Sequence, residues 1–252
     1  MEQLLLFDVD GTLCESGKII SAKMVNILNN FKKYGIKIGI VGGGTYEKIL
    51  FQLNNLVFPD FIFSECGSVY HKFNSVNLTY SLIHKNNLRN EPEYIKINSL
   101  VKTSLKFISE VDYLLSGNFI DLRNGLIYIS LVGMSGNDKE RENFIKLDKI
   151  NSYRSKLIEI LKLQSIQLDL EDYLDICEGG SVGIALYPKK WNKVQVLNWF
   201  DLSVNQIHFF GDKYLPDGND YELINNKHVI PHRIDSTNDT FNELSEMLEK
   251  IN

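Results

Sequence analysis

The length, composition and charge of the chain limit the classes of protein it can be. Its 252 residues, 44% of them hydrophobic and 23% charged, are enough for a substantial core in one large domain or two small ones. The net charge of -5 gives no general attraction to nucleic acid or to an anionic membrane, so an anionic ligand has to be held by individual lysines and arginines. The sequence has no apolar run of membrane-spanning length, no signal-peptide pattern and only three widely spaced cysteines, so we expect a cytoplasmic protein without disulfides or zinc.

An apolar strand near the start of the chain leads directly into two carboxylates. Leu4 to Phe7 is nearly continuous apolar sequence, as in a parallel strand covered on both faces, and Gly11 allows a tight turn after it. Ligands of parallel sheets bind beyond the carboxyl ends of the strands, where Asp8 and Asp10 are expected. Asp8 suits a nucleophile and metal ligand, and Asp10 suits a proton carrier. The competing interpretation is an acidic turn that only closes the strand.

A helix and a second strand follow. Ser21 is placed to cap the helix, and Ile36 to Val41 has the apolar character of a buried strand, so the three elements predict a right-handed parallel crossover. The strand ends in glycines. The backbone N–H groups of Gly43 and Gly44 and the hydroxyl of Thr45 form a candidate phosphate site, with a plain flexible loop as the alternative.

The middle of the chain differs from its start. A polar stretch containing Pro92 leads to a helix and then to the clearest hairpin signal, the turn Asn124-Gly125. A helix over Tyr153 to Leu163 and strand-like runs at Ile166 to Leu170 and Val182 to Tyr187 come next. Antiparallel strands and helices inserted in a parallel domain predict an α+β cap. The expected bounds are 1–82 and 187–252 for the core and 83–186 for the cap.

The last third of the chain predicts a return to the core. Lys193 precedes a predicted helix over Val194 to Phe200, and Gln206 to Phe210 is an apolar strand that ends just before Asp212. Asp220 follows shortly after. Asp212 and Asp220 are candidate metal ligands, and Lys193 is a candidate cation for a transferring phosphoryl group. The competing interpretations are helix caps and a solvated charge.

Together these residues predict magnesium-dependent phosphoryl transfer. Asp8 would attack phosphorus in line and become an aspartyl phosphate, while Asp10 would protonate the leaving oxygen and later deprotonate the acceptor. Asp8, Asp212 and a backbone oxygen in the Asp10 turn, with Asp220 beside them, offer the hard oxygen ligands that Mg2+ prefers.

Longer stretches of the sequence resemble a known family. Asp8-Val9-Asp10-Gly11-Thr12 after an apolar strand is similar to the signature of haloacid dehalogenase-like phosphotransferases, and the chain as a whole resembles the eukaryotic-type phosphomannomutases. The stretches that carry this resemblance are Leu6 to Leu13, Ile38 to Gly43, Phe63 to Gly67, Phe119 to Gly125, Lys146 to Asp148, Gly179-Gly180, Trp191 to Lys193 and Phe209 to Asp220. It implies an α/β fold, with a Rossmann-like parallel-sheet core of the haloacid dehalogenase type and an inserted α+β cap. It also implies a cytosolic, magnesium-dependent isomerase that interconverts hexose 1- and 6-phosphates through a bisphosphate and forms homodimers through the cap.

The resemblance also implies roles for individual residues. It makes Asp8 the nucleophile and Asp10 the acid and base, and it assigns Asp212 to magnesium. Arg123 and Arg141 match cap arginines that hold the distal phosphate of the substrate, a role that suits the guanidinium fork. The competing interpretations are a cation at the end of a hairpin and a solvated helix face.

Several expected substrate contacts are missing. Gly17 and Met134 stand where the family has arginines, and Gly183 and Ala185 stand where a serine and an aspartate contact the substrate. Gly44-Thr45 replaces the usual Ser-Asp. We therefore predict a phosphohexomutase with altered sugar specificity. The alternatives are a sugar-phosphate phosphatase, in which water takes the phosphoryl group, and a non-catalytic sugar-phosphate binder, against which the retained carboxylates argue.

Overall fold

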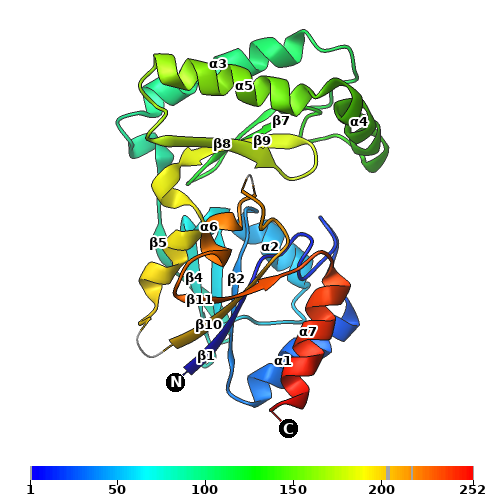
Figure 1. The fold of residues 1–252 in the computed structure, drawn as a ribbon, viewed down its shortest axis with the longest axis vertical. Helices are drawn as coiled ribbons and strands as arrows, with labels where there is room; N and C mark the ends of the chain where they lie inside the picture. The colour runs from blue at the N-terminus through cyan, green and yellow to red at the C-terminus, as the bar shows by residue number, and fades with distance from the viewer. Residues whose placement is uncertain (1, 203–204, 217, 252) are drawn as a thin grey trace. The chain divides into compact units, whose positions relative to one another are not determined.

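A computed structural model describes residues 2–202, 205–216 and 218–251 (Figure 1). The chain divides into two compact units, which we describe separately. Unit 1 comprises Met1–Lys85 and Trp191–Asn252, and unit 2 comprises Asn86–Lys190. Among the described residues, no helix has the length and apolar character needed to cross a membrane.

Unit 1 is built on a seven-stranded sheet with the order β11-β10-β1-β2-β3-β4-β5. The strands from β11 to β3 are parallel, whereas β4 and β5 add an antiparallel edge. The strands are β1 (Glu2–Phe7), β2 (Lys37–Val41), β3 (Phe61–Ser64), β4 (Val69–Asn74), β5 (Thr79–Lys85), β10 (Asn205–Gly211) and β11 (Val229–Arg233). The predicted parallel core is confirmed, and the antiparallel edge is an addition that we did not predict.

Helices cover both faces of this sheet. Leu5 and Phe7 of β1 join an apolar cluster with α1 (Ala22–Lys33), α2 (Tyr46–Leu53) and α7 (Thr237–Glu249), while Leu4 and Leu6 join a second cluster. That second cluster includes side chains from the short helix α6 (Tyr221–Ile224) and from η4 (Lys193–Trp199). Burial on both faces explains why β1 is apolar throughout. The helix expected over Val194 to Phe200 is a 3-10 helix, η4.

Unit 2 contains a four-stranded antiparallel sheet with the order β6-β7-β9-β8. Its elements are α3 (Tyr94–Ser109), β6 (Ile120–Leu122), β7 (Ile127–Ser130), α4 (Asp138–Asn151), α5 (Tyr153–Gln167), β8 (Leu174–Gly179) and β9 (Gly183–Pro188). Helices α3 and α5 lie side by side on one face of the sheet (Figure 1). The α+β character predicted for the insertion is confirmed.

One predicted strand of unit 2 is wrong. The run Ile166 to Leu170 alternates like a strand, but α5 continues to Gln167 and buries Leu157, Leu161 and Ser165 at helical spacing. Tertiary packing of this helix therefore outweighs the local alternation. The strand lies later, as β8, and pairs with β9.

Candidate active site

Two carboxylates of unit 1 follow directly from neighbouring parallel strands. Asp8 comes after β1 and Asp212 after β10, and the two strands pair in register up to Phe7 and Phe210. The backbone N–H of Asp8 donates to the carbonyl of Phe210 at 2.9 Å, which extends the pairing by one residue. Asp8, Asp212 and Asp220 each present an oxygen atom within 4.8 Å of the others. We call these three residues the acidic cluster.

Lys193 holds two members of the acidic cluster. Its side chain is fully buried, and its Nζ donates to Asp8 Oδ1 at 2.5 Å and to Asp220 Oδ1 at 2.6 Å. Asp220 Oδ2 accepts the backbone N–H of Lys213 at 3.0 Å. Lys193, the first residue of η4, is therefore a buried cation. The competing interpretation, a solvated charge, is wrong.

The electrostatics of the cluster favour added positive charge. Burial, together with the nearby charges of Asp220 and Asp212, raises the pKa of Asp8 to about 7, although the charge of Lys193 opposes this rise. Burial and the charge of Asp220 also raise the pKa of Asp212. Burial opposes the charge of Lys193, but Asp220 and Asp8 hold its pKa above the ordinary value. One lysine for three carboxylates leaves negative charge that burial makes costly.

The donor set fits a divalent cation. Asp212 Oδ1 is buried and has no hydrogen-bond partner among the described residues. Gly11, with φ +95°, lies so close that a Cβ there would be 2.4 Å from Asp212 Oδ2. Only glycine permits this approach of the Asp10 turn to the cluster. Oxygen ligands, excess negative charge and an unpaired buried oxygen together are what a hard cation requires.

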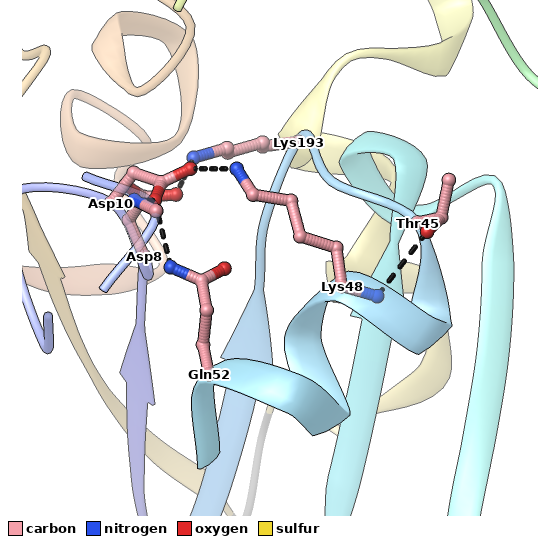
Figure 2. Close-up of polar contacts among 7 residues, drawn as sticks. Asp8, Asp10, Thr45, Lys48, Gln52 and Lys193 are labelled. Carbon is pink, nitrogen blue, oxygen red and sulfur yellow. Dashed lines mark hydrogen bonds and ion pairs between the residues drawn. The ribbon is translucent and has the colours of Figure 1, made fainter. Parts of the chain in front are cut away.

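Asp10 lies in a second, separate set of contacts (Figure 2). Its Oδ1 accepts hydrogen bonds from the backbone N–H of Gly17 and from Gln52 Nε2, both at 2.8 Å, and its Oδ2 accepts Lys48 Nζ at 2.5 Å. Burial alone would raise the pKa of Asp10, but the charge of Lys48 and these hydrogen bonds bring it below the ordinary value. Asp10 is therefore held as an oriented carboxylate.

Sequence reasoning did not identify Lys48 or Gln52. They stand four residues apart on α2, and this spacing places them on one side of the helix, facing Asp10 (Figure 2). Gln52 is only 1% exposed, and a buried amide in a predicted amphipathic helix is the signal that could have shown its role.

The glycine loop after β2 is fixed by its neighbours. The carbonyls of Gly42 and Gly44 accept the backbone N–H groups of Cys66 and Glu65, each at 2.9 Å. A Cβ on Gly43 would lie 3.7 Å from Asn219 Nδ2, next to Asp220 in the chain. Thr45 caps α2, because its hydroxyl oxygen accepts the backbone N–H of Lys48 at 3.3 Å (Figure 2).

The two predicted arginines belong to unit 2. Arg123 Nε donates to Asp121 Oδ2 at 2.7 Å, and its guanidinium lies 5.1 Å from the centre of the Tyr128 ring. Arg141, on α4, donates from Nε to the carbonyl of Gly136 at 2.9 Å. Arg141 is therefore not a freely solvated charge, and both side chains are held in defined positions.

A parallel sheet with carboxylates at its strand ends and an inserted α+β unit defines a protein of the haloacid dehalogenase fold. Solved structures share it. The *Plasmodium falciparum* IMP-nucleotidase bound to IMP has a TM-score of 0.70 at 16% identity over 98% of this chain and 68% of that chain. The *Candida albicans* trehalose-6-phosphate phosphatase C-terminal domain has a TM-score of 0.64 at 14% identity over 100% and 94%.

Sequence comparison narrows this class to one family. The eukaryotic phosphomannomutase family model matches residues 24–250. A phosphomannomutase of Babesia bovis is 35% identical over an alignment 258 residues long, and the match covers 99% of this chain and 99% of that one. A phosphomannomutase of Glycine max is 33% identical over 240 residues, 94% of this chain and 92% of that one. The chain therefore belongs to the eukaryotic phosphomannomutase family, a family of phosphotransferring isomerases, as its resemblance predicted.

Proposed function

We propose that this protein is a magnesium-dependent phosphohexomutase that interconverts hexose 1- and 6-phosphates. The observation that carries the proposal is the buried arrangement of Lys193 with Asp8 and Asp220, beside Asp212, at the carboxyl ends of parallel strands. Its relatives named phosphomannomutase support a phosphorylated hexose as the substrate.

In this proposal Asp8 is the nucleophile. An electron pair of its carboxylate forms a bond to phosphorus while the bond from phosphorus to the sugar oxygen breaks. Lys193 fixes Oδ1 of Asp8 and so orients the carboxylate for in-line attack. Gly43, Gly44 and Thr45 would contribute N–H and hydroxyl groups to the phosphoryl oxygens.

The acidic cluster would hold Mg2+, with a backbone oxygen of the Asp10 turn as a further ligand. When bound, the ion neutralises charge on the transferring phosphoryl group. The unpaired Oδ1 of Asp212 and the excess of carboxylates support this assignment.

Added magnesium is expected to raise the melting temperature more at pH 8 than at pH 5. The folded pKa of Asp8, about 7, lies above its ordinary value of 3.8, so its proton stabilises the cation-free protein at low pH and this stabilisation is lost as pH rises toward 7. The cation competes with that proton and therefore stabilises most where the proton is gone. Thermal unfolding at both pH values, with magnesium or with a chelator, measures the difference. Equal shifts at the two pH values, or an undiminished shift in Asp212→Asn, would contradict the assignment.

Asp10 would exchange protons with the sugar oxygens. Its low pKa makes it a carboxylate that can take a proton from the acceptor hydroxyl, and the same proton then serves the next leaving oxygen. Gly17, Lys48 and Gln52 position it through their three hydrogen bonds.

Replacing Lys48 with methionine is expected to lower kcat by roughly 10- to 100-fold, a part of what a positioned acid or base contributes. Loss of the ammonium group also raises the pKa of Asp10, so the acidic limb of the kcat/KM profile should move to higher pH. Steady-state kinetics from pH 5 to 9 test this, with Lys48→Arg as a partial rescue. Lys33→Met, which removes an exposed lysine bonded to Asn30, is the control. An unmoved acidic limb would show that Lys48 does not act on Asp10.

Unit 2 would supply substrate recognition and the dimer contact. Arg123 and Arg141 suit the second phosphate, because guanidinium groups grip phosphate with two donors. Exposed apolar side chains on the neighbouring helices α3 and α5, namely Leu105, Ile160, Leu163 and Ile166, support association of two copies through this unit. We also propose that the protein acts in the cytoplasm.

The second candidate function is a sugar-phosphate phosphatase. Gly17, Met134, Gly183 and Ala185 remove expected substrate contacts, and a poorly held sugar would let water take the phosphoryl group. The structural neighbours that are phosphatases favour this alternative.

One coupled assay separates these functions. The purified protein with magnesium is given mannose 1-phosphate or glucose 1-phosphate, with and without a hexose bisphosphate, while 6-phosphate and free phosphate are both followed. We expect 6-phosphate to be the main product. If free phosphate is the only product, the phosphatase function replaces the mutase function. If Asp8→Asn is as active as the wild type, both functions are excluded.

A further inference from the structure

The sheet of unit 2 has one apolar face and one mixed face. Cross-strand pairing places Tyr128 beside Ala185, and Ala185 beside Cys177. The adjacent row, Ile127 with Leu186 and Ile176, is buried in the unit. Successive residues of a strand point to opposite faces, so Tyr128 lies on the face opposite to this buried row.

The Tyr128 ring lies directly over two glycines. A Cβ on Gly183 would be 2.4 Å from Tyr128 Cζ, and a Cβ on Gly179 would be 2.9 Å from Tyr128 Cε2. Neither glycine has a positive φ, so the backbone does not require glycine there. The ring requires it. Tyr128 therefore excludes a serine at position 183, where the family resemblance led us to expect one.

The phenol group of Tyr128 lies among positive charges. The guanidinium of Arg123 is 5.1 Å from the ring centre. Burial raises the pKa of the Tyr128 phenol, and the charges of Arg123, Arg141 and Arg154 oppose that rise. The hydroxyl makes no hydrogen bond within the described part of the chain, so this neutral donor is available to a ligand.

We propose that Tyr128 is a specificity-determining residue that packs its ring against the sugar ring of the substrate, beside the arginines that hold the phosphate. This inference rests on the proposed function. A site that hydrogen-bonds one hydroxyl rejects analogues strongly, whereas an apolar contact discriminates weakly. The Tyr128 ring stands in place of the expected serine and aspartate contacts. We therefore expect the protein to accept hexose phosphates with either configuration at C2.

The test compares two epimers in the full-length protein with magnesium. Wild-type kcat/KM for mannose 1-phosphate and glucose 1-phosphate should differ by less than about 10-fold. Tyr128→Leu keeps apolar bulk but loses the ring, and KM for both sugars should rise about 5- to 10-fold with a smaller change in kcat. Tyr128→Phe keeps the ring and should stay within about 3-fold of the wild-type KM, since one neutral hydrogen bond contributes little. Tyr94→Leu, the same change at a half-buried tyrosine on α3, is the matched control.

A second pair of variants tests the packing on which the inference depends. Gly183→Ser should lower the melting temperature, because its Cβ meets the Tyr128 ring. In a Tyr128→Ala background, Gly183→Ser should lower the melting temperature much less. An equal decrease in the two backgrounds would show that the ring does not determine the residue at position 183.

The outcomes separate this inference from the proposed function. A wild-type preference above about 100-fold for one epimer, or an unchanged KM in folded Tyr128→Leu, would overturn the inference while the mutase stands. If the protein turns over neither sugar, the proposed function fails. In that case the inference is tested by calorimetric Kd values for mannose 6-phosphate and glucose 6-phosphate in wild type and Tyr128→Leu. A preference above about 100-fold for one epimer, or an unchanged Kd in Tyr128→Leu, would overturn it.

Discussion

Asp8→Asn is expected to reduce phosphoryl transfer by roughly 10^4- to 10^6-fold, the range found when a member of another covalent catalytic group is removed. Asparagine has nearly the same shape and can still accept the hydrogen bond from Lys193, but its amide does not form an acyl phosphate. The loss should appear in kcat for both the mutase and the phosphatase reaction, because both begin with the same attack.

Asp60→Asn is the matched control for this substitution. Asp60 is another partly buried carboxylate of unit 1, and it accepts hydrogen bonds from the backbone N–H of Ile38 and from Lys37 Nζ. Its replacement should leave kcat within about 3-fold of wild type, because asparagine can still accept the Ile38 N–H and the change only weakens the ion pairs with the partly exposed Lys37 and Lys32. A similar loss in both variants would mean that general destabilisation, and not the missing nucleophile, explains the result.

Lys193→Met is expected to cost both activity and stability. It leaves Asp8 and Asp220 without their buried cation, and breaking such a pair destabilises by about 3 to 5 kcal/mol. The pKa of Asp8, which the charge of Lys193 holds down, should then rise further, so the folded variant binds more protons than the unfolded chain. Its stability should fall as pH rises, and the variant should be closer to wild type at pH 5 than at pH 8.

Urea unfolding at pH 5 and pH 8 measures this difference. Lys37→Met removes a half-exposed lysine paired with Asp60 and should cost less than about 1 kcal/mol at either pH. Added magnesium should recover part of the stability of Lys193→Met, since the cation takes over the neutralisation of the acidic cluster. A loss that is the same at both pH values would contradict the view that unpaired carboxylates cause it.

The carboxyl-end positions of Asp8 and Asp212 were predictable from the sequence, and the structure confirms where they lie. Continuous apolar runs such as Leu4 to Phe7 indicate buried parallel strands, and such strands end at a common sheet edge. The Asn124-Gly125 hairpin was also predictable, because the residues that favour such a turn are adjacent in the sequence. The roles of these residues in catalysis stay predictions.

Contacts that depend on how separate elements pack were not predictable. Lys48 and Gln52 meet Asp10 only because α2 follows β2 back along the sheet, and the pattern of α2 alone does not show which polar side chains face the strand ends. The fit of Tyr128 over Gly183 needs the register between β7 and β9, which a single sequence does not specify. Without this register, Gly183 looks like a lost contact when it is half of a packed pair.

Trapping the covalent intermediate tests the central claim most directly. Wild-type protein with magnesium is mixed with mannose 1-phosphate or glucose 1-phosphate, quenched, and treated with borohydride, which reduces an aspartyl phosphate to homoserine. Peptide mass spectrometry should then find homoserine at position 8 and none in protein that was not given substrate. Homoserine at another aspartate, or product formation with Asp8 unmodified throughout turnover, would contradict the assignment of Asp8 as the nucleophile.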